Sequence, residues 1–118
     1  MQYLLLIYAN EKTWDQQSDA EKGKMMEEYG AFSDSIVKTG NYKAGEPLQP
    51  TATATTVRVR GGKTQVTDGP FAETREQLGG FYWVEASHLD EAIEMAARIP
   101  NARDGSIEVR PIMVIPGR

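Results

Sequence analysis

The chain has 118 residues, of which 40% are hydrophobic, a formal net charge of −4 and no cysteine. This length predicts one domain over residues 1–118, and the lack of cysteine excludes disulfides, thiolate catalysis and cysteine-based metal sites. An acidic chain with a pI near 5.0 and scattered cations is not expected to bind nucleic acid directly. Its longest apolar run, residues 3–9, is too short to cross a bilayer, so we expect a cytoplasmic protein without a membrane partner.

The first predicted elements are a strand and a helix. Residues 3–8 form an unbroken apolar run of strand length, which predicts a strand covered on both faces. Ser18 is the predicted N-cap of a helix, and Glu21 completes a capping box. Gly40 is placed just beyond the C-cap. An apolar stripe at helical spacing lies between these ends and predicts an amphipathic helix: Met25, Tyr29, Phe32 and Ile36.

The middle of the chain predicts strands. Residues 41–55 are rich in glycine, proline and threonine, which favours a short strand followed by a loop. Residues 56–60 and 63–67 flank Gly61 and Gly62 in the arrangement of a two-residue hairpin, and their polar alternation predicts a half-exposed ribbon. Residues 80–86 predict an aromatic strand.

A second helix and a final strand complete the prediction. Ser87 and Asp90 form a candidate capping box, and Pro100 is expected to end the helix. Its apolar face consists of Leu89, Ala92, Ile93 and Ala96. The final strand is predicted over residues 106–115, with alternating apolar and charged residues before an apolar end broken by Pro111.

This order of elements predicts an α+β fold, a ferredoxin-like βαββαβ sandwich with an inserted β-hairpin. Two helices cover only one face of such a sheet, whereas the first strand and the aromatic strand are predicted to be buried on both faces. A second copy of the chain is the simplest cover. We therefore expect a two-fold homodimer with the sheets packed face to face.

Residues 68–82, with the sequence DGPFAETREQLGGFY, are the most distinctive part of the chain. They place a turn, a charge cluster and two glycines ahead of an aromatic strand, which predicts a loop that belongs to a site. The segment resembles the signature of the YCII-related, or DGPF-domain, family, with Arg75 where lysine is more usual. The segments AGEPL at 44–48 and IEVRP at 107–111 are also similar to this family. The resemblance covers nearly the whole chain and implies a dimeric α+β barrel.

Three residues are candidates for catalysis: Asp68, Tyr29 and Glu73. Asp68 either fixes its own turn by accepting backbone N–H bonds or faces a pocket as a general base. Glu73 is a second candidate base, with a solvated charge as the alternative. Tyr29 is a candidate proton donor or oxyanion partner, although an aromatic residue within an apolar helical stripe usually belongs to the core.

Three more residues are candidates for substrate binding: Arg75, Glu46 and Trp83. Arg75 lies between acidic residues, so it either clamps a carboxylate of a ligand or neutralises its neighbours. Trp83 is expected to line a pocket between two sheets, with core packing as the alternative. The only histidine, His88, is interpreted as a surface residue directly after the N-cap of the second helix. We expect no metal and no cofactor.

The family resemblance also bears on chemistry. In better-understood relatives of the YCII fold, a histidine on the first helix and an aspartate after the second helix form a dyad to which catalysis is assigned. Alignment on the Glu46-Pro47 turn places these positions on Tyr29 and near Ile99 of this chain. The resemblance therefore implies that the dyad is missing here.

Two functions are compatible with these residues and with the resemblance. The first is a cofactor-independent enzyme or binder that acts on a small organic molecule in a pocket next to the DGPF loop. The second is a non-catalytic regulatory dimer. The resemblance implies for it an extracytoplasmic-function sigma factor as partner in transcription control, because relatives of the family are often encoded beside such factors or fused to them.

Overall fold

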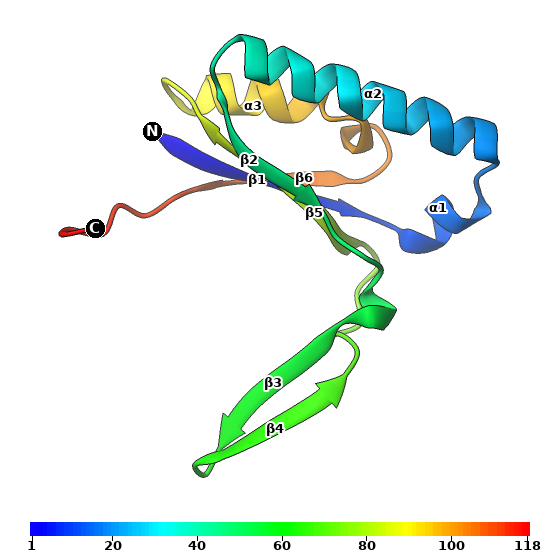
Figure 1. Cartoon of the computed structure of the whole chain (residues 1–118), viewed down its shortest axis with the longest axis vertical. Helices are drawn as coiled ribbons and strands as arrows, with labels where there is room; N and C mark the ends of the chain where they lie inside the picture. The colour runs from blue at the N-terminus through cyan, green and yellow to red at the C-terminus, as the bar shows by residue number, and fades with distance from the viewer.

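A computed structural model describes residues 1–118 and contains a four-stranded antiparallel sheet with its two long helices on one face (Figure 1). In spatial order the strands are β2 (Tyr42–Pro47), β5 (Gln77–Glu85), β1 (Gln2–Ala9) and β6 (Ser106–Pro111). The two long helices, α2 (Asp19–Lys38) and α3 (Leu89–Arg98), connect β1 to β2 and β5 to β6. This is the predicted ferredoxin-like βαββαβ topology.

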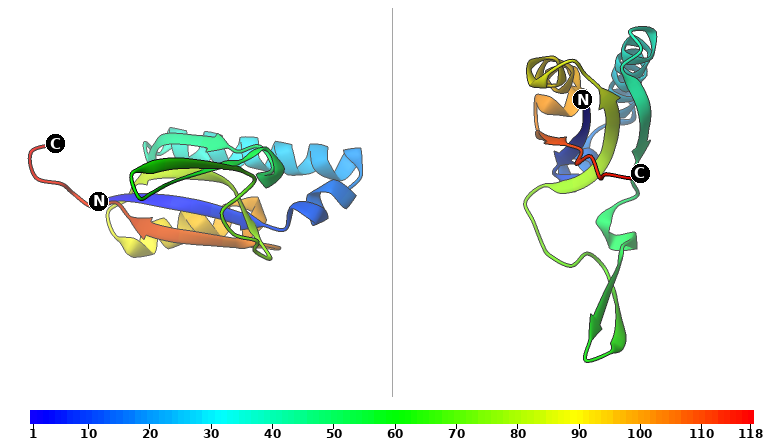
Figure 2. Two further views of the ribbon diagram at one scale, coloured as in Figure 1. Left: turned by 90° about the horizontal axis from the view of Figure 1, so that it is seen from below. Right: turned by 90° about the vertical axis from the view of Figure 1, so that its left-hand side faces the viewer.

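The inserted hairpin forms a separate ribbon of β3 (Thr55–Arg60) and β4 (Lys63–Asp68), which stands away from the helices on the opposite side of the sheet (Figures 1 and 2). Gly61 and Gly62 join its strands at φ angles of 57° and 76°. Such positive angles are what a two-residue hairpin turn requires, so the predicted hairpin is confirmed. All six residues of β4 are exposed, which makes the ribbon more exposed than its sequence predicts.

The core lies between the sheet and the two long helices. Tyr3, Leu5 and Ile7 of β1 point toward the helices, and Phe32 of α2 packs edge-on against Tyr82 of β5 with ring centroids 5.1 Å apart. The other members of the core are Ile36, Val84, Ala86, Ala92, Met95, Ala96 and Ile99. The second face of the sheet, which we call the open face, is covered by no element of the chain (Figure 2). Its cover by a second copy stays a prediction.

Helix α2 begins and ends as predicted. The Ser18 hydroxyl accepts a hydrogen bond from the Glu21 N–H, and the Glu21 carboxylate accepts one from the Ser18 N–H, each at 3.1 Å. Thr39 is the C-cap, and Gly40 follows it at a φ of 80°. These local contacts place both ends of the helix without help from the rest of the fold.

Helix α3 begins one residue later than predicted. Its N-cap is His88, not Ser87, because Nδ1 of the imidazole accepts a hydrogen bond from the Glu91 N–H at 3.3 Å. A neutral imidazole nitrogen is an acceptor, as a serine hydroxyl is. The Glu91 carboxylate in turn accepts a hydrogen bond from the Ser87 N–H. Glu91 therefore has the capping role that the sequence assigned to Asp90.

Strand β6 is shorter than predicted, and residues 112–118 continue as a tail away from the sheet (Figure 1). The last bond to β1 is donated by the Ile112 N–H to the carbonyl of Gln2, where β1 begins. No strand remains beyond this point for the tail to pair with.

Three short elements complete the chain: α1 (Glu11–Gln16) and the 3₁₀ turns η1 (Thr51–Thr53) and η2 (Pro100–Ala102). Helix α1 was not predicted. Asn10 caps it, because its Oδ1 accepts a hydrogen bond from the Lys12 N–H at 3.0 Å. None of the helices combines the length and the hydropathy that a membrane span requires.

Candidate functional site

A cavity of about 540 Å³, which we call the loop cavity, lies beside the signature loop. Three segments far apart in sequence form its walls: the start of α1, the start of η1 and the loop itself. Most of its lining residues are polar or charged, and Pro70 and Ala72 are the apolar members: Asn10, Glu11, Lys12, Thr51, Pro70, Ala72, Glu73, Thr74, Arg75 and Gln77. Cavities of this size hold small organic molecules, and a polar lining favours a polar ligand.

Glu11 holds the three walls together. Its carboxylate accepts hydrogen bonds from the backbone N–H of Thr51 at 2.8 Å and from the Thr51 hydroxyl at 2.9 Å. Its own backbone N–H donates to Oε1 of Gln77 at 2.9 Å. The Glu11 carboxylate is therefore engaged by the protein and serves the structure of the cavity.

The signature loop is also fixed by its own side chains. The Thr74 hydroxyl donates to the carbonyl of Glu76 at 2.5 Å, and Nε2 of Gln77 donates to the carbonyl of Thr74 at 2.6 Å. Ser106 of β6 donates to the Glu76 carboxylate at 2.8 Å. Glu73 and Arg75 make no hydrogen bond or ion pair within the chain. These two charges in the loop cavity are available to a ligand.

Asp68 lies at the end of β4 and does not line the loop cavity. Its carboxylate is exposed and accepts no hydrogen bond, so it does not fix the turn as one prediction held. The turn is instead held by the Gly69 N–H, which donates to the carbonyl of Ala54 at 2.7 Å, and by the Thr56 hydroxyl, which donates to the carbonyl of Gly69 at 2.8 Å. Gly69 has a φ of 94°, which favours glycine there.

Tyr29 is half-buried in the helical layer, and its hydroxyl donates to Oδ1 of Asn101 at 2.5 Å. Burial raises the pKa of the Tyr29 phenol far above its ordinary value of 10.0, so the group keeps its proton well into alkaline pH and does not act as a phenolate base near neutral pH. Asn101 borders a small cavity of about 30 Å³ beside Gln17, whose Oε1 is buried without a partner. Tyr29 lines neither this cavity nor the loop cavity.

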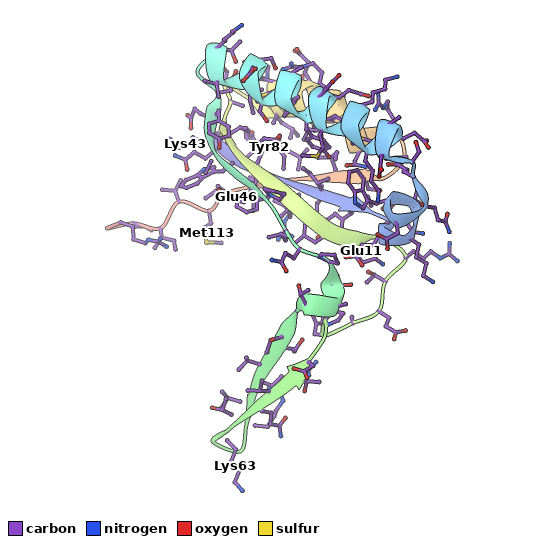
Figure 3. All side chains as sticks on the ribbon, turned by 45° about the vertical axis from the view of Figure 1, so that its right-hand side comes forward. Glu11, Lys43, Glu46, Lys63, Tyr82 and Met113 are labelled. Atoms are coloured by element: carbon purple, nitrogen blue, oxygen red, sulfur yellow. The ribbon has the colours of Figure 1, made fainter.

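Glu46 and Trp83 belong to the open face of the sheet, where Figure 3 labels Glu46. Nε1 of Trp83 donates to Oε1 of Gln2 at 3.1 Å, and the ammonium of Lys43 lies 5.8 Å from the centroid of the indole ring. Trp83 borders a different cavity, of about 600 Å³, which the apolar tail at 112–115 forms with Leu4 of β1. The structure therefore separates Trp83 from Arg75.

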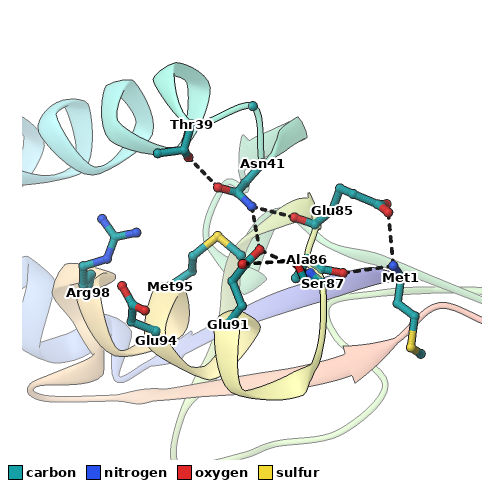
Figure 4. Close-up of a pocket in the computed structure, with 11 residues that line it drawn as sticks. Met1, Thr39, Asn41, Glu85, Ala86, Ser87, Glu91, Glu94, Met95 and Arg98 are labelled. Carbon is teal, nitrogen blue, oxygen red and sulfur yellow. Dashed lines mark hydrogen bonds and ion pairs between the residues drawn. The ribbon is translucent and has the colours of Figure 1, made fainter.

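A further cavity of about 540 Å³ lies at the other end of the sheet, between the end of α2 and the start of α3 (Figure 4). Nδ2 of Asn41 donates to the carbonyl of Glu85 at 2.8 Å and to the Glu91 carboxylate at 3.0 Å. The amino group of Met1 donates to the Glu85 carboxylate at 3.1 Å and to the carbonyl of Ala86 at 2.9 Å. Because most of its polar groups are paired with one another, we assign this region to the structure of the fold.

The six predicted site residues thus lie in four places. Glu73 and Arg75 share the loop cavity, and Glu46 and Trp83 lie on the open face. Asp68 ends β4, and Tyr29 lies in the helical layer. The sequence patterns did not reveal that Glu11, Thr51 and Gln77 build the loop cavity. The Glu11–Thr51 contact joins residues 40 apart in the chain, and the Glu11–Gln77 contact joins residues 66 apart. The only local signal was Asn10-Glu11 directly after a strand, which is typical of a helix N-terminus.

The fold and the loop cavity define the class of this protein. It is a ferredoxin-like α+β protein with an inserted β-ribbon and a cavity, lined mostly by polar residues, at the base of that ribbon. The family model of the YCII-related domain matches residues 1–116, and the chain belongs to this family. An uncharacterised protein of Rhizobium meliloti (strain 1021) is 40% identical to it over 114 residues, which cover 95% of this chain and 92% of that protein. The family predicted from the sequence is confirmed.

Proposed function

We propose that this protein binds a small, polar organic molecule with an anionic group in the loop cavity. The observation that carries the proposal is the pair of charges, Glu73 and Arg75, that face a polar cavity without partners in the chain. A guanidinium with free donors binds a carboxylate or phosphate through two parallel hydrogen bonds. Lys12 borders the same cavity and adds a second positive charge.

Glu73 gives the site a second recognition element. A free carboxylate accepts hydrogen bonds from a hydroxyl or amine of a ligand, so a molecule with an anionic end and a donor end fits the cavity best. Of the two bases predicted from the sequence, Glu73 borders the cavity and Asp68 does not. Glu73 is therefore the group that would accept a proton if the bound molecule is also a substrate.

The test begins with a thermal-shift screen of the purified protein against small carboxylates, phosphates and hydroxy or amino acids, since a ligand that binds only the folded state raises its melting temperature. Hits are titrated by calorimetry with wild type, Arg75→Ala and Lys24→Ala. Lys24 is an exposed cation on α2 without a hydrogen bond or ion pair and serves as the control. We expect Arg75→Ala to weaken binding by about tenfold or more, and Lys24→Ala to leave it unchanged.

Glu73→Gln separates binding from turnover. If a hit is also consumed, Glu73→Gln should abolish its consumption while it still binds, because the amide keeps the size of the side chain but cannot accept a proton at neutral pH. A screen without any stabilising compound, or hits that bind Arg75→Ala as tightly as wild type, would refute the loop cavity as the site.

A further inference from the structure

We propose that the β3–β4 ribbon is an arm that packs against a second copy of the chain through a stripe of valines. The argument for this interaction surface does not use the ligand proposed for the loop cavity. Three properties of the ribbon support it: its two different faces, its position relative to the open face, and its charge.

The ribbon has two chemically different faces, because residues opposite each other in a strand pair share a face. Val57 pairs with Val66 and Val59 pairs with Thr64, so the three valines form one stripe. They are 59%, 60% and 65% exposed, whereas such side chains are usually covered. The opposite face carries polar and basic residues: Thr56, Arg58, Arg60, Lys63, Gln65 and Thr67.

A two-stranded ribbon of this kind needs a cover. In water an isolated hairpin is marginally stable, and it gains stability when an apolar face packs against something else. Here β3 and β4 pair only with each other, and no residue of either strand belongs to the core. The valine stripe therefore lacks a partner within the chain.

The position of the ribbon points to a second copy as that partner. The ribbon projects from the sheet on the side away from the helices, which is the side of the open face (Figures 1 and 2). The open face itself presents apolar side chains that are only partly covered: Leu4, Leu6, Tyr8, Phe81 and Trp83. A copy placed on the open face would lie beside the ribbon, and two-fold symmetry would give each chain both an arm and a surface to receive one.

Charge favours the same occupant. Arg58, Arg60 and Lys63 put three positive charges on residues 56–67, which contain no acidic residue, and Figure 3 labels Lys63 at the tip. Because the whole chain has a net charge of −4, the remainder has a charge of −7. These cations lie on the ribbon face opposite the valines, so they act by long-range attraction between a basic arm and an acidic second body, which steers the two chains together and adds no contact to the valine interface.

The test uses sedimentation velocity over the micromolar range with three proteins. The stripe variant carries Val57→Thr, Val59→Thr and Val66→Thr, which keep β-branched side chains and remove apolar surface. The control carries Gln65→Thr on the opposite face. We expect dimers for wild type and control, and a dissociation constant raised about tenfold or more for the stripe variant. A wild type that sediments as a monomer throughout, or a stripe variant that dimerises as tightly as wild type, overturns the proposal.

A second variant covers the case in which the stripe variant does not fold. Replacement of residues 56–67 by Asn-Gly removes the ribbon and none of the core, so the body should keep a cooperative melting transition. This variant should also dimerise about tenfold or more weakly. A photo-crosslinker at position 59, in a mixture of isotope-labelled and unlabelled chains, should join peptides from two different chains. Crosslinks confined to one chain, or formed with another protein only, overturn the second copy as the occupant.

Discussion

Glu11 gives the sharpest test of how the loop cavity is built, because one carboxylate ties α1 to η1. Glu11→Ala removes its hydrogen bonds to the Thr51 N–H at 2.8 Å and to the Thr51 hydroxyl at 2.9 Å. Hydrogen bonds to a charged group contribute about 1.5–3 kcal/mol each, but Glu11 is only half-buried, so we expect a total loss of about 2 kcal/mol. This loss corresponds to a melting temperature lowered by roughly 8 °C.

Denaturant titration followed by tryptophan fluorescence measures the change in the free energy of unfolding. Thr51→Val keeps the N–H bond and loses only the hydroxyl bond, so it should cost about 1 kcal/mol. Glu27→Ala is the matched control, since Glu27 is exposed on α2 and forms no hydrogen bond or ion pair. It should stay within about 0.5 kcal/mol of wild type. If Glu11→Ala is as stable as Glu27→Ala, the carboxylate does not hold the cavity together.

Further tests address helix α2 and strand β5. Ser18→Ala should cost about 1 kcal/mol in denaturant titration, because it removes the N-cap of α2. The hydrogen bonds to Ser18 lower the pKa of Glu21 below its ordinary value of 4.5. This carboxylate therefore contributes stability above pH 4.5, and the contribution is lost as the pH falls further. Glu21→Gln should lose less stability than wild type between neutral and acidic pH in thermal melts. Burial raises the pKa of Tyr29 above 10.0, so the contribution of its protonated phenol to stability is present below pH 10 and lost at higher pH. Tyr29→Phe should therefore lose less stability than wild type when the pH is raised above 10. Equal losses in the two proteins would contradict this account. Gly80→Ala should lower the free energy of unfolding by about 1 kcal/mol, because the new Cβ would lie 3.0 Å from the Glu46 carbonyl oxygen. Gly79→Ala is the control, since its Cβ meets no atom within 4 Å, and it should melt at a higher temperature than Gly80→Ala.

The parts of the fold that were predicted from sequence are those whose signals are local. Ser18 with Glu21 starts α2, Gly40 ends it, and the pair at 61–62 turns the hairpin, each by contacts within a few residues. The start of α3 was misplaced by one residue because His88 and Ser87 are both able to accept the capping bond. Helix α1 has six residues and no apolar periodicity, so only its cap, Asn10, marks it.

The site was predicted only where its residues adjoin in sequence. Glu73 and Arg75 lie two residues apart in a recognisable loop, and both border the loop cavity. The Glu11–Thr51 contact is invisible to sequence patterns, because it depends on where β1 ends relative to η1. Glu46 and Trp83 were assigned to the same site as Arg75, but the alternation of side chains along β2 and β5 places them on the open face.

The loop cavity and the ribbon meet at residues 69 and 70, since Gly69 ties the base of the ribbon to Ala54 and Pro70 borders the cavity. If both proposals hold, a ligand that orders the loop should change the position in which the arm is held. Thermodynamic linkage then makes the effect reciprocal. For each site, dimerisation changes the affinity for the ligand by some factor, and the ligand changes the dimer dissociation constant by that same factor. We expect saturating ligand to change the dimer dissociation constant by about fivefold or more, measured by sedimentation with and without ligand. Arg75→Ala should remove the effect of the ligand without weakening the unliganded dimer, because Arg75 borders the cavity and lies outside the ribbon. A ligand that binds tightly and leaves dimerisation unchanged would mean that the turn at Gly69 isolates the arm from the site.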